Sequence, residues 1–155
     1  MTKRFAMTRK LFARLATATV LGAGLPALAA APAHAAGCST TAFDRRLPAG
    51  SYVCAYRPTL WTYDSRLHAF VVGTNATNAI YHTWADTPGG PLRSAWISLG
   101  GTGRSSVEAL NYRNPRGGLA LAIGVYTTGG GAICKDFNDE RPGAWYPSLT
   151  GWESC

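Results

Sequence analysis

Two stretches of the chain decide the fold, because they give nearly the same pattern twice. The first reads LHAFVVGT (67–74), AIYHTWADTPGG (79–90) and AWISLGG (95–101). The second reads LALAIGVYT (119–127), AICKDFNDERPG (132–143) and AWYPSLTG (144–151). Corresponding residues lie about 50 positions apart. Short apolar runs that are punctuated by glycine and repeat at this period are typical of β-propeller blades rather than helical arrays.

The alternation within each copy predicts four short strands joined by turns rich in glycine, asparagine and proline. We expect strands at 51–56, 68–73, 79–84 and 95–99 in the first copy, and at 106–112, 119–125, 132–137 and 144–149 in the second. The copies span about 51–101 and 104–151. Essentially no helix is expected beyond the N-terminal segment, because no other stretch keeps a 3.6-residue period. The predicted fold is all-β, with two four-stranded antiparallel blade-like sheets.

Residues 1–35 have the pattern of a secretory signal peptide. Five basic residues come first, an apolar stretch covers 15–30, and Ala33-His34-Ala35 is a small-x-small cleavage site. The competing interpretation, a membrane anchor, needs about 20 uninterrupted apolar residues, whereas Thr17 and Thr19 interrupt this stretch. We therefore expect a secreted protein whose mature part, 36–155, is one two-repeat domain without a transmembrane segment.

The composition of the mature part bears on its partners. Ten basic and eight acidic residues remain after cleavage, and all five tryptophans and seven tyrosines lie there. Nucleic acid is not an expected partner, because binding it requires a clustered basic face. Aromatic enrichment favours strands and aromatic contact surfaces.

Four cysteines, Cys38, Cys54, Cys134 and Cys155, indicate two disulfides in an exported chain of this size. Three pairings are possible. We favour Cys38 with Cys54 and Cys134 with Cys155, since each bridge would tie one chain end to its nearest blade. In a second interpretation, Ala35-Ala36-Gly37-Cys38 is a lipobox without its usual leucine, and Cys38 carries a lipid anchor.

The third predicted strand of each copy carries its apolar residues on one face. Ile80, His82 and Trp84 alternate with Tyr81 and Thr83, as Ile133, Lys135 and Phe137 alternate with Cys134 and Asp136. We expect the first set in each copy to fill the layer between the blades. The alternative is that Trp84 is exposed and stacks against a sugar.

The first copy also carries a family pattern, "F-V-x-G-T-(Asn/Asp)", "(Leu/Ile)-Tyr-His-x-Trp" and "Trp-x-(Ser/Thr)-Leu-Gly-Gly". The matching residues are Phe70, Val71, Gly73, Thr74, Asn75, Ile80, Tyr81, His82, Trp84, Trp96, Ser98, Leu99, Gly100 and Gly101. This stretch resembles the blades of secreted bacterial propeller lectins of the fucose-binding photorhabdus-lectin type. The second copy is less similar, with Cys134, Lys135 and Phe137 in place of Tyr, His and Trp.

The resemblance implies a propeller with sugar pockets between neighbouring blades, but two blades cannot close a ring. Either several chains associate into a homo-oligomer that completes a propeller, or the two sheets pack face to face and the disulfides supplement a small core. We expect the second arrangement.

We expect a non-catalytic carbohydrate-binding module. The alternative is a secreted interaction or inhibitor protein on the same scaffold. An enzyme is not expected, since His68 and His82 lie in no recognisable catalytic motif, nor is a metal or organic cofactor. The partner would be a glycan or another extracellular surface. Sugar recognition needs aromatic platforms and planar polar groups, and the candidates near a blade junction are Asn75, His82, Trp84, Arg93, Trp96, Tyr126 and Lys135.

Overall fold

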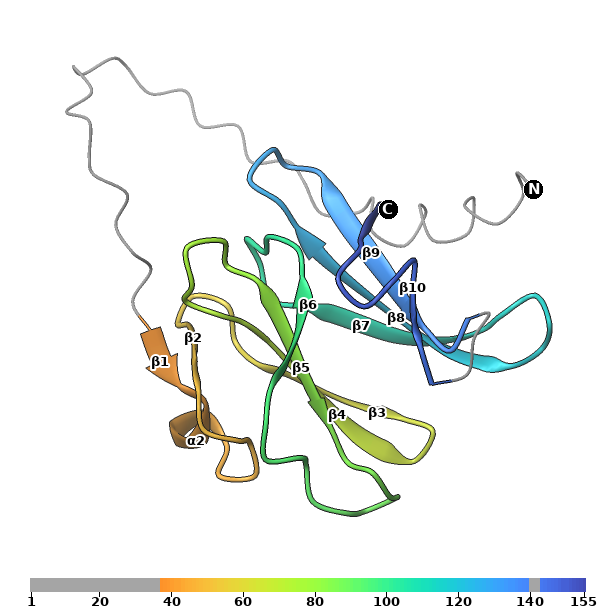
Figure 1. Cartoon of the computed structure of the whole chain (residues 1–155), viewed down its shortest axis with the longest axis horizontal. Coiled ribbons are helices and arrows are strands. Elements are labelled where there is room, and N and C mark those ends of the chain that lie inside the picture. The colour runs from red at the N-terminus through yellow and green to blue at the C-terminus, as the bar shows by residue number, and fades with distance from the viewer. Residues whose placement is uncertain (1–36, 140–142) are drawn as a thin grey trace.

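The computed structural model describes residues 37–139 and 143–155. This part of the chain forms an all-β domain of antiparallel sheets, as predicted (Figure 1). The expected signal peptide, 1–35, lies outside the described residues. Among the described residues, no helix is long and apolar enough to cross a membrane.

The first large sheet is a four-stranded meander in chain order. Its strands are β3 (Thr59–Tyr63), β4 (Arg66–Val72), β5 (Ile80–Trp84) and β6 (Ile97–Gly100). Asp64 and Ser65 form the two-residue turn between β3 and β4, with φ values of 47° and 59°. Positive φ at both positions is the geometry of a type I′ turn, whose twist matches that of the paired strands.

The second large sheet repeats this order. It consists of β7 (Glu108–Arg113), β8 (Leu119–Tyr126), β9 (Ala132–Phe137) and β10 (Trp145–Tyr146), and β11 (Glu153–Ser154) also pairs with β9. Each copy of the sequence pattern therefore forms one antiparallel meander. The predicted fold class is confirmed.

The N-terminal segment departs from the prediction. Strand β1 (Gly37–Ser39) pairs with β2 (Ser51–Val53), and a four-residue helix, α2 (Thr40–Phe43), follows β1. The predicted strand 51–56 was therefore wrong as the first strand of the first sheet, and a strand at 59–63 takes that place. Residues 51–53 instead pair with β1 in a small two-stranded sheet, and the Cys38–Cys54 bridge ties the same two segments together. The short helix was also missed.

The two large sheets pack face to face around one apolar core. Phe70 and Tyr63 of the first sheet meet Trp145 and Phe137 of the second, with ring centroids 6.3 Å and 6.0 Å apart respectively. The buried core residues are Val53, Tyr63, Phe70, Val72, Ile80, Leu99, Val107, Leu121, Ile123 and Val125. Each such side chain contributes on the order of 1.5–3 kcal/mol when fully buried.

Hydrogen bonds link the two sheets at both edges of this sandwich. At one edge, the Trp61 indole N–H donates to Asn111 Oδ1 at 2.9 Å, joining β3 to β7. At the other, the Trp152 indole N–H donates to the Leu99 carbonyl at 2.8 Å. The face-to-face arrangement expected for two blades is therefore the one observed.

Both favoured disulfides are present. Cys38 pairs with Cys54 and Cys134 with Cys155, with Cα atoms 5.0 Å and 5.2 Å apart, inside the usual range. Disulfides of this kind are typical of proteins that mature in an oxidising compartment. Because the Cys38 sulfur is already bonded to Cys54, lipidation of Cys38 would require this bridge to be absent.

Candidate functional site

The interface between the sheets holds a stack of aromatic rings centred on His82. Its ring lies parallel to Phe70 and to Trp84, with centroids 4.6 Å and 4.9 Å away. Trp145 of the second sheet meets it edge-on at 5.3 Å. His82 is 1% exposed, so it fills the layer between the sheets, as the alternation in the sequence predicted for Ile80, His82 and Trp84.

A second buried histidine completes this cluster. His68 Nδ1 lies 2.9 Å from His82 Nε2. Burial lowers the pKa of His82 well below its usual value and that of His68 to about 4, so both rings are neutral at pH 7. His82 Nδ1 is buried and has no hydrogen-bond partner among the described residues. One N–H bridges the two rings in either tautomer: His82 Nε2–H donates to His68 Nδ1 and leaves His82 Nδ1 as an unpaired acceptor, or His68 Nδ1–H donates to His82 Nε2 and leaves His82 Nδ1 as an unpaired N–H. A buried unpaired N–H is rarer than a buried unpaired acceptor, which favours the form in which His82 donates to His68.

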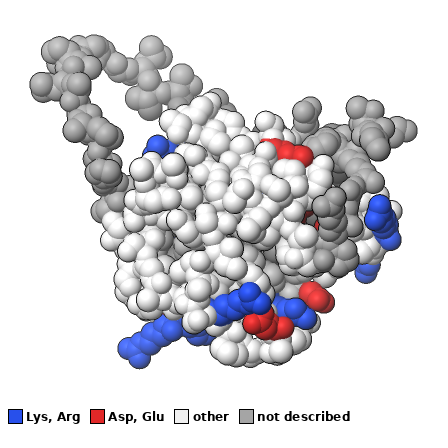
Figure 2. Space-filling view, in the orientation of Figure 1, with Lys and Arg blue, Asp and Glu red and all other residues white. Residues whose placement is uncertain are grey.

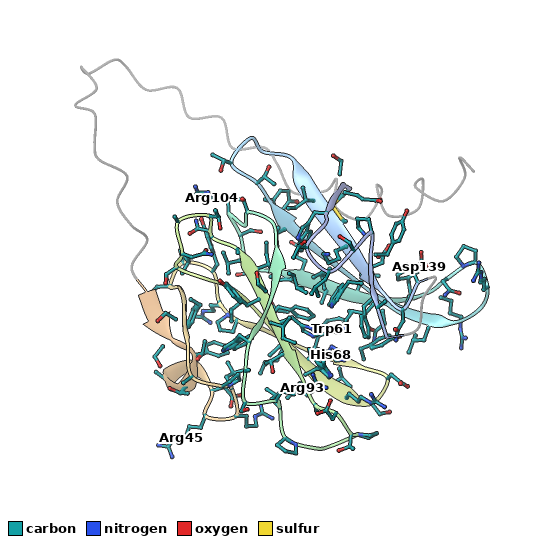
Figure 3. All side chains as sticks on the ribbon, in the orientation of Figure 1. Arg45, Trp61, His68, Arg93, Arg104 and Asp139 are labelled. Atoms are coloured by element: carbon teal, nitrogen blue, oxygen red, sulfur yellow. A yellow bond between two sulfur atoms is a disulfide. The ribbon has the colours of Figure 1, made fainter. Side chains whose placement is uncertain are left out.

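Trp84 is held at the edge of the same stack. The Arg93 guanidinium lies 3.9 Å from the Trp84 ring centroid, and it also forms an ion pair with Asp86 at 2.7 Å. Figure 3 labels Arg93, in the segment between β5 and β6, and His68, on β4. Because the ring already contacts both His82 and Arg93, protein groups occupy surface that a stacking sugar would need.

Lys135, the counterpart of His82 in the second copy, is also directed between the sheets. It is 1% exposed, and its Nζ donates to the carbonyls of Ser148 and Leu149. The ammonium also lies 5.8 Å and 5.4 Å from the ring centroids of Trp145 and Trp152. Burial lowers its pKa to about 8. Lys135 therefore anchors the segment that follows β10.

An open pocket lies on the other side of the first sheet. Its volume is about 330 Å³. Val71 and Tyr81 come from the outer face of β4 and β5, opposite to Phe70 and His82, whereas Gly50 and Ser51 come from the N-terminal segment. The full lining is Gly50, Ser51, Val71, Gly73, Thr74, Asn75, Tyr81 and Trp96.

Hydrogen bonds fix the polar and aromatic groups of this pocket. Asn75 Oδ1 accepts from the backbone N–H of Ala79 at 2.8 Å, and Asn75 Nδ2 donates to the Tyr81 hydroxyl at 3.3 Å. The Trp96 indole N–H donates to the carbonyl of Pro48 at 3.1 Å. The tryptophan thereby ties the N-terminal segment to the first sheet, and hydrogen bonds within the protein hold both aromatic rings in place.

Two glycines let these rings lie directly against the backbone. A Cβ atom at Gly73 would come within 2.6 Å of Tyr81 Cε2, and one at Gly50 within 3.1 Å of Trp96 Nε1. Contacts below 3.0 Å do not occur for real Cβ atoms. Any other residue at Gly73 would therefore displace the tyrosine ring and change the shape of the pocket.

The pocket lining carries no formal charge, since every lining residue is a glycine, an apolar or aromatic residue, or a neutral polar one. Most of the face seen in Figure 2 is likewise uncharged, and its basic side chains gather mainly along the lower edge. Among the described residues, no group of three or more His, Cys, Asp or Glu side chains is arranged to hold a metal ion. The pocket therefore offers no charged side chain that could pair with an ion.

The structure brings only two of the predicted site residues, Asn75 and Trp96, into this pocket. His82, Trp84 and Arg93 form the stack at the sheet interface, Lys135 lies beneath the segment after β10, and Tyr126 ends β8. The lining residues that sequence reasoning missed are Gly50, Ser51, Val71, Gly73, Thr74 and Tyr81. For Tyr81 a signal was present, because the alternation already placed it on the face opposite His82.

Trp96 and Trp145, which match in the sequence pattern, lie on opposite faces of their sheets. Trp145 pairs with Phe137 and packs on the core, whereas Trp96 lines the outer pocket. A shift of one residue turns a strand side chain to the other face, and a register irregularity at Ile80 and Tyr81 lies between β5 and β6. This inequivalence gives the first sheet an aromatic platform on its outer face.

A scan against known protein families and a search of curated proteins found no match to this chain.

Proposed function

We propose that this protein is a non-catalytic carbohydrate-binding module whose sugar site is the pocket under the N-terminal segment. One observation carries the proposal: Trp96 and Tyr81 line a single cavity together with the neutral polar side chains of Asn75, Thr74 and Ser51. Aromatic rings pack against the apolar C–H face of a pyranose, and amide and hydroxyl groups bond its oxygens. Both kinds of group are already oriented here by hydrogen bonds within the protein.

The size of the pocket supports a small ligand. Its volume of about 330 Å³ lies at the lower end of the range for ligand sites, which suits one sugar ring rather than a long oligosaccharide. The two disulfides and the pattern of residues 1–35 support a protein that acts outside the cell, where glycans are abundant. One chain with its own closed core would bind one sugar without forming a propeller ring.

A comparison of two tryptophans tests the proposal. A glycan array on the mature protein identifies ligands, and calorimetry then measures the affinity of the wild type, Trp96→Ala and Trp84→Ala. We expect Trp96→Ala to weaken binding at least tenfold and Trp84→Ala to leave it within about twofold, because only Trp96 lines the pocket. Circular dichroism and thermal melting confirm that both variants are folded.

Two outcomes would count against this site. If Trp84→Ala loses binding and Trp96→Ala keeps it, the sugar is bound at the edge of the sheet interface. If the folded wild type binds no glycan at all, the proposed function is wrong, and the alternative of a secreted interaction or inhibitor protein becomes the one to test. Light scattering on the same samples measures whether one chain or an assembly is the binding unit.

A further inference from the structure

The hydrogen bonds around Tyr81 determine whether its hydroxyl acts as a donor or as an acceptor within the protein. Asn75 Oδ1 accepts from the Ala79 backbone, so the amide must present Nδ2 to Tyr81. The tyrosine oxygen is therefore the acceptor in that bond, and its own proton remains available. No acceptor for this proton is found among the described residues, so the hydroxyl is ready to donate to a ligand.

The remaining lining residues give the pocket both an apolar wall and further hydroxyl groups. The Trp96 indole N–H is already bonded to Pro48, so this ring offers only its apolar surface. Val71 is 3% exposed and lines the same cavity, next to Gly73. The pocket thus places a hydroxyl donor beside an apolar wall, while Ser51 and Thr74 supply hydroxyls that can accept or donate.

A hydroxyl donor beside an apolar wall matches the acetamido group, a common substituent of neutral sugars with a carbonyl and a methyl group. We infer that the pocket selects a 2-acetamido sugar, with the acetamido carbonyl accepting from the Tyr81 hydroxyl and the methyl group against Val71 and Trp96. The acetamido N–H is then left to bond Thr74 or Ser51. This inference rests on the proposed carbohydrate-binding function and adds the substituent that the site recognises.

The uncharged lining excludes the charged relatives of such a sugar. A free hexosamine would bring an ammonium into a pocket without a carboxylate, and a uronic acid would bring a carboxylate without a cation to pair with it. A plain hexose would fit, but it would leave the apolar wall without the methyl group and the tyrosine donor without a carbonyl.

A matched ligand series on the wild-type protein tests this selection. Calorimetry compares the methyl glycosides of N-acetylglucosamine, glucose, glucosamine and glucuronic acid. We expect the acetamido sugar to bind at least tenfold more tightly than each of the others, the difference that one lost hydrogen bond and one lost methyl contact produce. N,N′,N″-Triacetylchitotriose, the trimer of N-acetylglucosamine, should bind within about threefold of the monomer, since the pocket holds one ring.

A variant then identifies the group responsible. Tyr81→Phe keeps the ring and removes the hydroxyl, which is both the donor to the ligand and the acceptor from Asn75 Nδ2. It should reduce binding of the acetamido sugar about tenfold and change the binding of glucose, which also contacts the Asn75 side of the pocket, by less than twofold. Tyr146→Phe is the matched control, because this exposed tyrosine of β10 does not line the pocket. Tyr146→Phe should leave the affinity for both sugars unchanged.

The outcomes separate this inference from the proposal beneath it. Equal affinity for glucose and N-acetylglucosamine would overturn the acetamido selection and leave carbohydrate binding in place. Tighter binding of either charged sugar, or of the trimer by tenfold or more, would also overturn it. Failure of the wild type to bind any of these sugars or any arrayed glycan would instead overturn the proposed function.

Discussion

Acid should destabilise this protein through the histidine pair at the sheet interface. His68 has a pKa of about 4 in the folded protein, against about 6.5 in an unfolded chain. Because the folded pKa is the lower one, the unfolded state binds a proton first as the pH falls. The stabilisation is therefore complete above pH 6.5 and is lost progressively down to about pH 4.

The size of this loss follows from the two pKa values. Between pH 7 and pH 4.5, the His68 contribution to the free energy of unfolding falls by about 2.5 kcal/mol. His82 acts in the same direction, because burial also lowers its pKa. Asp136 acts in the opposite direction: burial and the nearby Asp139 raise its pKa to about 6, so the folded state binds that proton more tightly as the pH falls.

The assay must therefore remove the carboxyl effect. Urea unfolding with the disulfides intact, followed by tryptophan fluorescence, gives the free energy of unfolding at pH 7 and pH 4.5. We compare Asp136→Asn with the double variant Asp136→Asn/His68→Gln. Glutamine does not titrate, and its carbonyl can still accept the His82 Nε2 proton.

The decisive quantity is the drop in stability between the two pH values, since it cancels any constant effect of the substitution. It should be about 2.5 kcal/mol smaller in the double variant than in Asp136→Asn alone. Equal drops in the two proteins would show that His68 titrates normally in the folded state, and would refute its burial against His82.

Three further predictions concern the core, the pocket and the second disulfide. Phe70→Ala should cost about 3–5 kcal/mol in unfolding free energy, because Phe70 is fully buried; a loss below 1 kcal/mol in urea unfolding would contradict this. Gly73→Ala should weaken sugar binding at least tenfold in calorimetry, since its Cβ would lie 2.6 Å from Tyr81; unchanged affinity would mean that the ring position is unimportant. Replacing Cys134 and Cys155 together by serine should cost about 3 kcal/mol, given their separation of 21 residues; an unchanged melting temperature would argue against that bridge.

Local sequence features were enough to predict most strands of the two large sheets. Alternation in Ile80–Trp84 and Ala132–Phe137 correctly predicted β5 and β9 and the inward face of His82 and Lys135. Side chains in a strand must alternate whatever surrounds them, so this information is local. The disulfide pairing was also predictable, because each bridge joins cysteines that are close in sequence.

The candidate site was less predictable, because the residues that line it come from segments far apart in the sequence, between Gly50 and Trp96. Trp96 and Asn75 were selected for their chemistry, but nothing in the sequence pattern distinguished Trp96 from Trp145. The stretch 51–56 looked like one more strand of the first sheet, whereas residues 51–53 pair with β1, to which the Cys38–Cys54 bridge also ties this segment.

The sequence by itself determined that this chain forms two antiparallel meanders and two disulfides between cysteines close in sequence, since strand alternation, turn chemistry and cysteine spacing are properties of short segments. Only the tertiary structure decided which tryptophan faces the core and which faces a pocket. A one-residue difference in register reverses the face of a side chain, and the N-terminal segment covers the outer face of the first sheet through contacts such as Trp96 with Pro48, 48 residues apart.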